Sequence, residues 1–213
     1  MLFYTDWADK AACIGRSRLD GQEHQKIIST DEQNQPILGW PNGITIDFEV
    51  PRPRLYFVDA QKDFVASCRL DGSDFKKLFV GAPETSHPFG VAVYKNLVVW
   101  NDWTKQAIFQ ADKGSGSAIQ VVKDKIRGAM DLKIYSNRLL KKEPTGCDDA
   151  SCSHVCITLP REKNKSTRQH KCLCPDGMKV DPDNQSECQC PSGQETLSNG
   201  TCSLLPGQVK NIK

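Results

Sequence analysis

The chain has 213 residues, of which 38% are hydrophobic and 25% are charged, and its formal net charge is +2. No apolar run approaches the ~18 residues that a membrane-spanning helix needs. The first residues lack the basic and apolar regions of a secretory signal. The balanced charge also argues against a nucleic-acid-binding protein. We therefore expect one or two domains that do not insert into a membrane.

A repeated pattern of short apolar runs fills the first part of the chain. Residues 2–6, 55–59 and 98–102 align without gaps, and each ends in an aspartate, so that Asp6, Asp59 and Asp102 recur 53 and then 43 residues apart. An element with alternating apolar residues precedes each later copy, at 40–47 and 87–94, and a degenerate third copy lies at 128–134. A repeat of this length predicts an array of similar structural units.

Each repeat predicts a small antiparallel sheet. Its turn residues and its alternating apolar runs are typical of three strands, and residues 76–80 supply a fourth. Four short strands every 40–50 residues are typical of a propeller blade, which is apolar on both faces because neighbouring blades sandwich it. We expect almost no helix, and strands near residues 2–6, 44–48, 54–59, 64–70, 90–94, 97–102, 106–112 and 130–135.

The cysteines are concentrated near the C-terminus. Residues 147–202 contain eight of the ten, a density that indicates a disulfide or metal framework. The close pairs Cys172–Cys174 and Cys188–Cys190 are separated by one residue, which suits zinc poorly. Sequons at Asn164, Asn184 and Asn199 predict glycosylation. This combination indicates an oxidising, extracellular compartment, and we expect neither a metal nor a cofactor.

The first part of the chain resembles the class B, or Tyr-Trp-Thr-Asp, repeats of the low-density lipoprotein receptor family. The resemblance rests on Leu2–Asp6, Leu55–Asp59 and Val98–Asp102 with the Leu-Asp-Gly turns at 19–21 and 70–72. In that family six blades close into a ring, and a module similar to epidermal growth factor follows. The cysteine spacing of residues 147–188 resembles this module. The expected fold is thus an all-β, partial propeller of about three blades with a small disulfide-rich module.

The resemblance implies a division of the chain and a set of disulfides. We expect propeller blades at 1–140, a linker at 141–146, the module at 147–188, a partial second module at 189–202 and a tail at 203–213. The six module cysteines allow 15 pairings by spacing alone. The resemblance implies Cys147–Cys156, Cys152–Cys172 and Cys174–Cys188. A local pair, Cys190–Cys202, is the simplest interpretation of the remaining two.

The family binds protein ligands on the blade face formed by loops at the ends of the inner strands. The positions that match are Trp7, Trp40, Asn42, His87, Phe89 and Trp103. Exposed aromatic residues are frequent anchors of protein recognition. The alternative is that these residues only pack one blade against the next, and for Phe89 the two interpretations are balanced. His87 has two interpretations as well: a turn residue before a proline, or a group that titrates in acidic endosomes.

Several departures from the family pattern carry information. No copy reads Tyr-Trp-Thr-Asp in full, and the chain opens at the second strand of a blade. We expect the C-terminal half of a propeller with its trailing module. A truncated secreted isoform, whose open edge another chain covers, is the alternative. Either form leaves apolar faces in water, so protease should cut residues 1–140 faster than 147–202.

The sequence contains no catalytic pattern. Its four histidines lie outside any Ser/His/Asp or Cys/His arrangement, and the recurrence of Asp6, Asp59 and Asp102 fits a structural hydrogen-bonding role. We expect a non-enzymatic extracellular segment of a membrane receptor, which binds a protein ligand or releases it at acidic pH during endocytosis or signalling. Its partners would be that ligand, the remainder of the propeller and other receptor chains. The alternative is a nidogen-like matrix-binding propeller.

Cys13 and Cys68 remain after the other eight cysteines pair. Aligned repeats place both on equivalent faces of successive blades, and such faces point the same way around a ring. Blade packing sets one face against the opposite face of its neighbour, so the two sulfurs should not meet. Packed sheets also lie about 10 Å apart, whereas a disulfide needs Cα atoms within ~7 Å. We predict no bond between them, and each is either a buried thiol or bonded to a cysteine in the missing part of the propeller.

Overall fold

The computed structural model describes residues 1–8, 11–136, 144–160, 168–197 and 200–205. The chain divides into two compact units, which we describe separately. The blade unit comprises residues 1–17 and 23–141, and the cysteine-rich unit comprises 18–22 and 142–213. The sequons at Asn164 and Asn199 lie outside the described residues, whereas Asn184 is described and exposed.

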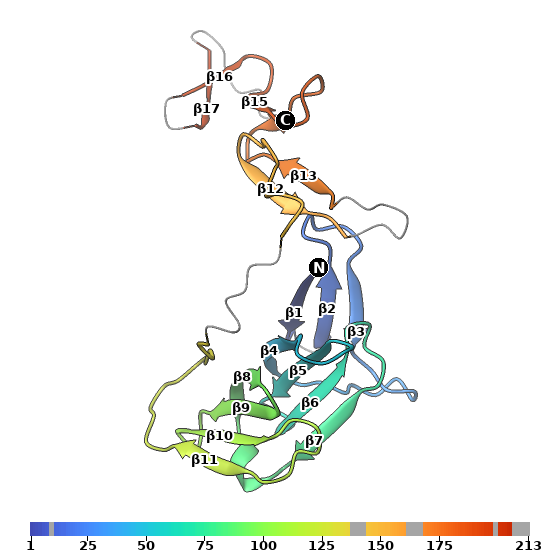
Figure 1. Cartoon of the computed structure of the whole chain (residues 1–213), viewed down its shortest axis with the longest axis vertical. Coiled ribbons are helices and arrows are strands. Elements are labelled where there is room, and N and C mark those ends of the chain that lie inside the picture. Colours follow the sequence, from blue (N-terminus) through green and yellow to red (C-terminus); the bar gives the residue numbers. More distant parts are fainter. Residues whose placement is uncertain (9–10, 137–143, 161–167, 198–199, 206–213) are drawn as a thin grey trace. The chain divides into compact units, whose positions relative to one another are not determined.

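The blade unit consists of three antiparallel sheets whose strands follow one another in chain order (Figure 1). Blade 1 contains β1 (Leu2–Asp6), β2 (Cys13–Ser17) and β3 (Gln25–Ile28). Blade 2 contains β4 (Pro41–Asp47), β5 (Arg54–Asp59), β6 (Phe64–Arg69) and β7 (Lys76–Val80). Blade 3 contains β8 (Pro88–Tyr94), β9 (Leu97–Asp102), β10 (Ala107–Asp112) and β11 (Gln120–Lys123). The predicted all-β fold is therefore confirmed.

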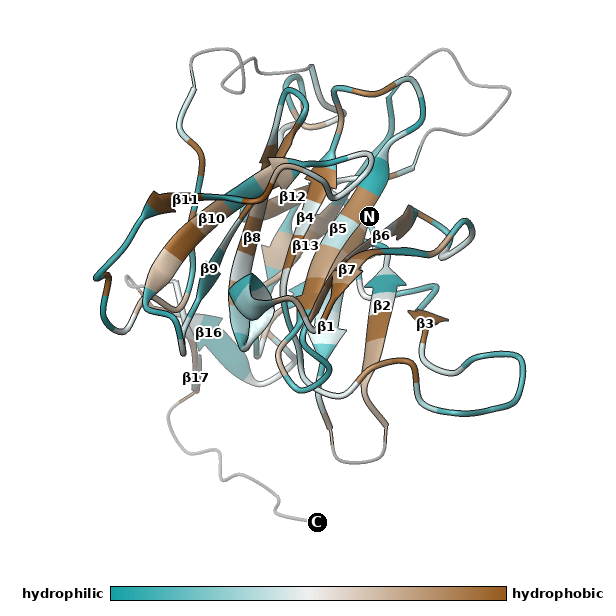
Figure 2. Cartoon of the chain, turned by 90° about the horizontal axis from the view of Figure 1, so that it is seen from below, coloured by the Kyte–Doolittle hydropathy of each residue, from teal (hydrophilic) through white to brown (hydrophobic). Residues whose placement is uncertain are grey.

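Blade 2 buries both of its faces. Side chains of a strand alternate between faces, and in β5 Leu55 and Phe57 join the apolar cluster shared with blade 1. Tyr56 and Val58 join the cluster shared with blade 3. Figure 2 shows hydrophobic residues along the strands and hydrophilic ones in the connecting loops. The continuous apolar run of β5 thus follows from its position between two neighbours.

Successive inner strands approach each other closely at glycines. A Cβ atom added to Gly43 of β4 would lie 2.6 Å from the carbonyl oxygen of Phe89 in β8. One added to Gly90 of β8 would lie 2.9 Å from the Cα atom of Asp131. Real Cβ atoms essentially never come this close to another atom. The opposing atoms here belong to the backbone, which cannot move aside as the end of a flexible side chain can. Glycine at these two positions therefore allows the inner strands to converge.

A buried ion pair also joins blades 2 and 3. The Lys113 ammonium, in the turn after β10, lies 2.5 Å from the carboxylate of Asp47 at the end of β4. The Asp47 side chain is 1% exposed. The hydroxyl of Tyr56 donates a hydrogen bond of 3.2 Å to the carbonyl oxygen of Lys113. Burial, and then the nearby Asp47 carboxylate, raise the pKa of Tyr56.

The structure corrects one predicted strand and adds three blade strands, β2, β3 and β11, that the expected ranges omit. Residues 130–135 have no strand pairing among the described residues, although we expected a strand there. An extended segment becomes a strand only when a neighbour accepts its ladder of hydrogen bonds. The outer strands β3 and β11 were absent from the expected set, because both are short and largely exposed. The one helix of the described residues is the 3₁₀ turn Pro83–Thr85.

The cysteine-rich unit contains three two-stranded sheets. They are β12 (Val155–Thr158) with β13 (His170–Leu173), β14 (Lys179–Val180) with β15 (Cys188–Gln189), and β16 (Gln194–Thr196) with β17 (Cys202–Leu204). Among its described residues only Cys172 and Met178 are buried apolar ones. Four disulfides link the strands and loops: Cys147–Cys156, Cys152–Cys172, Cys174–Cys188 and Cys190–Cys202. These are the same four pairs that the sequence analysis names.

Candidate ligand-binding surface

The aspartate that ends β5 shapes the loops on one side of blade 2. The Asp59 side chain is fully buried. Its two carboxylate oxygens accept hydrogen bonds from the backbone N–H groups of Gly39 (2.7 Å), Trp40 (3.1 Å), Gln61 (3.1 Å) and Lys62 (2.9 Å). Because a buried carboxylate needs such partners, Asp59 fixes the backbone that presents Trp40.

The equivalent aspartates of blades 3 and 1 do the same. Asp102, at the end of β9, accepts hydrogen bonds from the backbone N–H groups of His87 (2.7 Å) and Lys105 (2.8 Å). Asp6, at the end of β1, accepts one from the N–H of Ala8 (2.9 Å). These contacts give the repeated aspartates a structural role in holding the loops.

Three rings from two neighbouring blades meet at this end of the sheets. The centroid of the His87 ring lies 6.2 Å from that of Trp40 and 5.7 Å from that of Trp103. The backbone N–H of Trp103 donates a hydrogen bond of 3.0 Å to the His87 carbonyl oxygen. Trp40 and Trp103 remain 43% and 49% exposed. We call these three residues the aromatic cluster; it has apolar area in contact with water and a backbone that is hydrogen-bonded in place.

Trp7 lies outside the aromatic cluster. It is 63% exposed, and together with Trp40 it lines a cleft of about 740 Å³ between blades 1 and 2. Sequence reasoning missed the polar residues of this cleft, among them Lys26, Gln61 and Lys62. The sequence did contain a signal for Gln61 and Lys62, because they follow the repeated Asp59 in the turn that its carboxylate holds.

The two remaining candidates, Asn42 and Phe89, lie in the inner strands β4 and β8 and are half-buried. The Asn42 carbonyl oxygen accepts a 2.8 Å hydrogen bond from the hydroxyl of Thr5 in blade 1. The Phe89 backbone packs against Gly43. Their backbones thus take part in contacts between blades.

A carboxylate lies near the aromatic cluster. Burial raises the pKa of Asp63, and the carboxylates of Asp102 and Asp59 raise it further, whereas His87 lowers it. The residue also adopts a left-handed backbone conformation with φ of 52°, which aspartate and asparagine tolerate better than most residues. His87 is therefore near acidic groups as well as indole rings.

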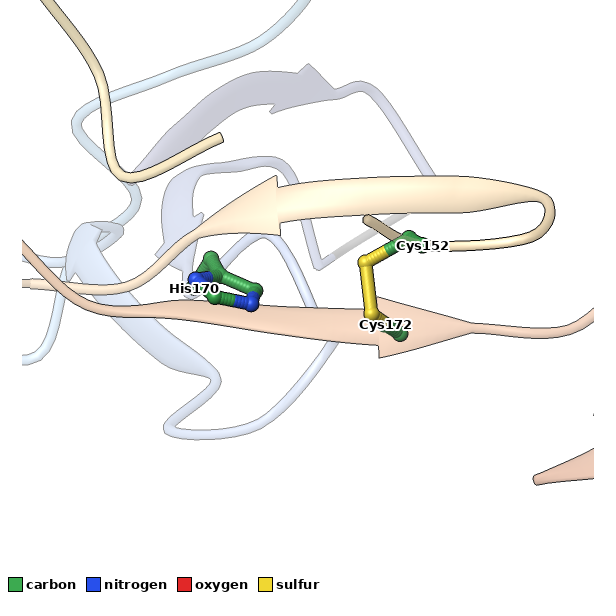
Figure 3. Close-up of side chains that lie close together, drawn as sticks. All are labelled: Cys152, His170 and Cys172. Carbon is green, nitrogen blue, oxygen red and sulfur yellow. A yellow bond between two sulfur atoms is a disulfide. The ribbon is translucent and has the colours of Figure 1, made fainter. Parts of the chain in front are cut away.

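One group in the cysteine-rich unit has the composition of a metal site. Cys152, His170 and Cys172 place a potential ligand atom of each within 4.8 Å of one another. Figure 3 shows that the two sulfurs are bonded to each other and that His170 lies on the same strand, β13, as Cys172. A disulfide offers no thiolate to a metal, so this group is structural.

Cys13 and Cys68 are free thiols, and both are buried. Cys68 belongs to the cluster between blades 1 and 2, and so does Ile14, the residue after Cys13. Side-chain alternation therefore puts Cys13 on the opposite face of its own blade. Burial raises the pKa of Cys68 to about 12, which keeps this thiol protonated and unreactive at neutral pH.

A comparison with known proteins identifies the repeats. The family model described as low-density lipoprotein receptor repeat class B matches residues 1–48. Vitellogenin receptor Yl of Drosophila melanogaster is 32% identical over 182 residues, covering 85% of this chain and 8% of that receptor. Sortilin-related receptor of Oryctolagus cuniculus is 35% identical over 168 residues, covering 78% of this chain and 7% of that receptor.

Among solved structures, a chain of a nidogen/laminin complex matches with a TM-score of 0.48 and 25% identity, covering 58% of this chain and 43% of that one. The described residues include no helix with the length and apolar character needed to cross a membrane. The present chain spans less than a tenth of the length of the two receptors above, and both relatives are receptors by name. Through its class B repeats, the chain belongs to the low-density lipoprotein receptor family.

Proposed function

We propose that this chain is part of the extracellular region of a receptor and that it binds a protein ligand through the aromatic cluster. The observation that supports the proposal is the arrangement of Trp40, His87 and Trp103, with both indoles half exposed on a backbone held by buried aspartates. Large, rigid aromatic side chains on a fixed backbone lose little entropy on binding. The four disulfides support an oxidising compartment.

Ligand release at acidic pH is the second part of the proposal. Histidine changes its charge between pH 5 and 8, and His87 lies between two indole rings near Asp63 and Asp102. A positive charge on His87 would change which ligand groups the aromatic cluster accepts. It would also attract the neighbouring carboxylates and the faces of the indole rings. An apolar ligand side chain that packs there at neutral pH would then bind more weakly.

The binding test uses vitellogenin as its probe, because the Drosophila relative is named for it. Surface plasmon resonance should show that Trp40→Ala with Trp103→Ala weakens binding at least tenfold, as expected when an interface loses two aromatic anchors. Val121→Ala is the matched control, since Val121 is an exposed apolar residue of β11 outside the aromatic cluster. Equal affinity of the double variant and the unmodified chain would refute the role of the cluster.

The release test compares the unmodified chain with His87→Gln at about pH 7.4 and about pH 5.5. The unmodified chain should bind more weakly at the acidic pH, and His87→Gln should remove most of that difference. His154→Gln is the control, because His154 lies in the cysteine-rich unit. A pH dependence that survives in His87→Gln would show that another group controls release.

A further inference from the structure

The connection between blades 1 and 2 is longer than the connection between blades 2 and 3. Residues 29–40 join β3 to β4, whereas residues 81–87 join β7 to β8, so the first connection has twelve residues and the second has seven. The two blade contacts are otherwise similar at their outer strands. A Cβ atom added to Gly72 would collide with the backbone of β3, and one added to Gly116 would collide with the backbone of β7. Joining two blades therefore does not require the extra residues, and loops of this kind frequently carry function.

The extra residues form a hairpin with its own hydrogen bonds. An antiparallel bridge closes its base. The Asp31 carboxylate accepts hydrogen bonds from the backbone N–H groups of Gln33 (2.9 Å) and Gln35 (2.8 Å). These bonds fix the backbone of the hairpin although its side chains are largely exposed. We call residues 29–37 the acidic hairpin.

An apolar groove lies between the acidic hairpin and the outer strands. Its volume is about 580 Å³, and ligand sites typically measure about 300–1,000 Å³. The apolar residues that line it are Ile27 and Ile28 of β3, Ile37 of the hairpin and Phe75, which precedes β7. Ile27, Ile37 and Phe75 are half-buried and pack against the apolar cluster between blades 1 and 2. The groove thus has a fixed apolar floor that is partly open to water.

The charged residues among the described lining residues are both acidic. They are Asp31 and Glu32, and both are exposed. The hairpin backbone uses the Asp31 carboxylate, whereas the Glu32 carboxylate has no hydrogen bond or ion pair within the described residues. One uncommitted carboxylate supplies too few ligands for a metal ion. Charge complementarity instead favours a cationic partner, and the apolar floor favours one whose charge stands beside an apolar side chain.

We propose that this groove binds an extended segment of a partner protein in which an apolar side chain stands next to a lysine or arginine. The apolar side chain packs on Ile37 and Phe75, and the cation pairs with Glu32. The proposal goes beyond the aromatic cluster, because none of the three cluster residues lines the groove. The blade unit then has two binding surfaces, one at the loops that the buried aspartates hold and one at the outer strands.

The first test titrates the isotope-labelled 213-residue chain with the peptide acetyl-Lys-Leu-Lys-Leu-Lys-amide and follows backbone amide shifts by NMR. Saturable shifts should concentrate at residues 27–37 and 72–75. Acetyl-Glu-Leu-Glu-Leu-Glu-amide, which reverses the charge, and acetyl-Lys-Ser-Lys-Ser-Lys-amide, which lacks the apolar side chains, should each bind at least about fivefold more weakly. Equal binding of the three peptides, shifts confined to other residues, or the absence of saturable shifts overturns the proposal.

The second test changes the groove and measures affinity for the same lysine–leucine peptide. Glu32→Lys reverses an exposed, uncommitted charge and should weaken binding about tenfold, whereas Asp124→Lys makes the same charge change at an exposed position outside the groove and should have little effect. Ile37→Thr keeps the branched shape but adds a hydroxyl, and should weaken binding about threefold. Val121→Thr, at an exposed position of β11, is its control.

The amide spectrum of each variant shows whether it is folded, and the titration of the unmodified chain stays decisive if Ile37→Thr is not. Equal affinity of Glu32→Lys and Asp124→Lys overturns the proposed cationic partner. Equal affinity of folded Ile37→Thr and Val121→Thr overturns the proposed apolar contact.

Discussion

The two units of this chain are stabilised by different means. The blade unit buries two clusters of apolar side chains between its sheets and contains two free thiols. The described part of the cysteine-rich unit buries only Cys172 and Met178 among apolar residues but holds four disulfides. Sheets that stack face to face create an interior, whereas two-stranded ribbons of two to four residues do not. Covalent links take the place of that interior in the second unit.

Reduction of the disulfides should have the largest effect, and it should unfold the cysteine-rich unit while the blade unit stays folded. The disulfides close loops with separations of 9 to 20 residues, and each contributes roughly 2–4 kcal/mol. Their combined loss exceeds the stability that so small a buried core can supply. Hydrogen exchange in mild reductant should show loss of protection in peptides from 147–202, with protection of β5, β6, β9 and β10 retained. Simultaneous loss in both units would contradict the comparison.

A core substitution should have the reverse effect. Trp100 is fully buried, its ring stacks on Phe109 at 5.6 Å, and its indole N–H donates to the Glu84 carbonyl oxygen at 2.9 Å. Trp100→Ala should lower the free energy of unfolding of the blade unit by about 3–5 kcal/mol and leave the four disulfides formed. Urea unfolding followed by circular dichroism measures the change. Trp103→Ala is the control, with an expected effect within about 0.5 kcal/mol.

The ion pair between blades 2 and 3 tests whether the blade unit also depends on a polar link. Lys113→Met leaves the Asp47 carboxylate buried without its cation, which should lower the free energy of unfolding by about 3 kcal/mol. Adding Asp47→Asn should restore most of the loss. Lys105→Met, at an exposed position, serves as the control. No difference between Lys113→Met and Lys105→Met would show that the pair contributes nothing.

The smallest expected effect concerns Asp63. Because its pKa is raised in the folded protein, its contribution favours the folded state at acidic pH and is lost as the pH rises through the folded pKa. Asp63→Asn should therefore raise the free energy of unfolding at pH 7, on the order of 0.5 kcal/mol, and change it less near pH 3. Asp124→Asn, at an exposed position, is the control for the substitution itself. A loss of stability at pH 7 would contradict this sign.

The local sequence pattern predicted the strands that pack on both faces. It failed where the formation of a strand depends on a neighbouring strand that pairs with it. The bounds of β5 and β9 were predicted correctly because their apolar runs and terminal aspartates recur. Residues 130–135 have the right pattern but no partner in the described residues, so the predicted strand was wrong. The aromatic cluster was predicted as candidate residues only. Its geometry depends on how one blade turns relative to the next, which no single repeat encodes.

The buried aspartates separate the shape of the candidate surface from its chemistry. Asp59 holds four backbone N–H groups and Asp102 holds two. None of these bonds uses the side chain of a presented residue. Positions 40, 87 and 103 can thus change identity while the loops keep their course. If the aromatic cluster binds a ligand as proposed, a scaffold of this kind permits ligand preference to change at these positions at little cost in folding.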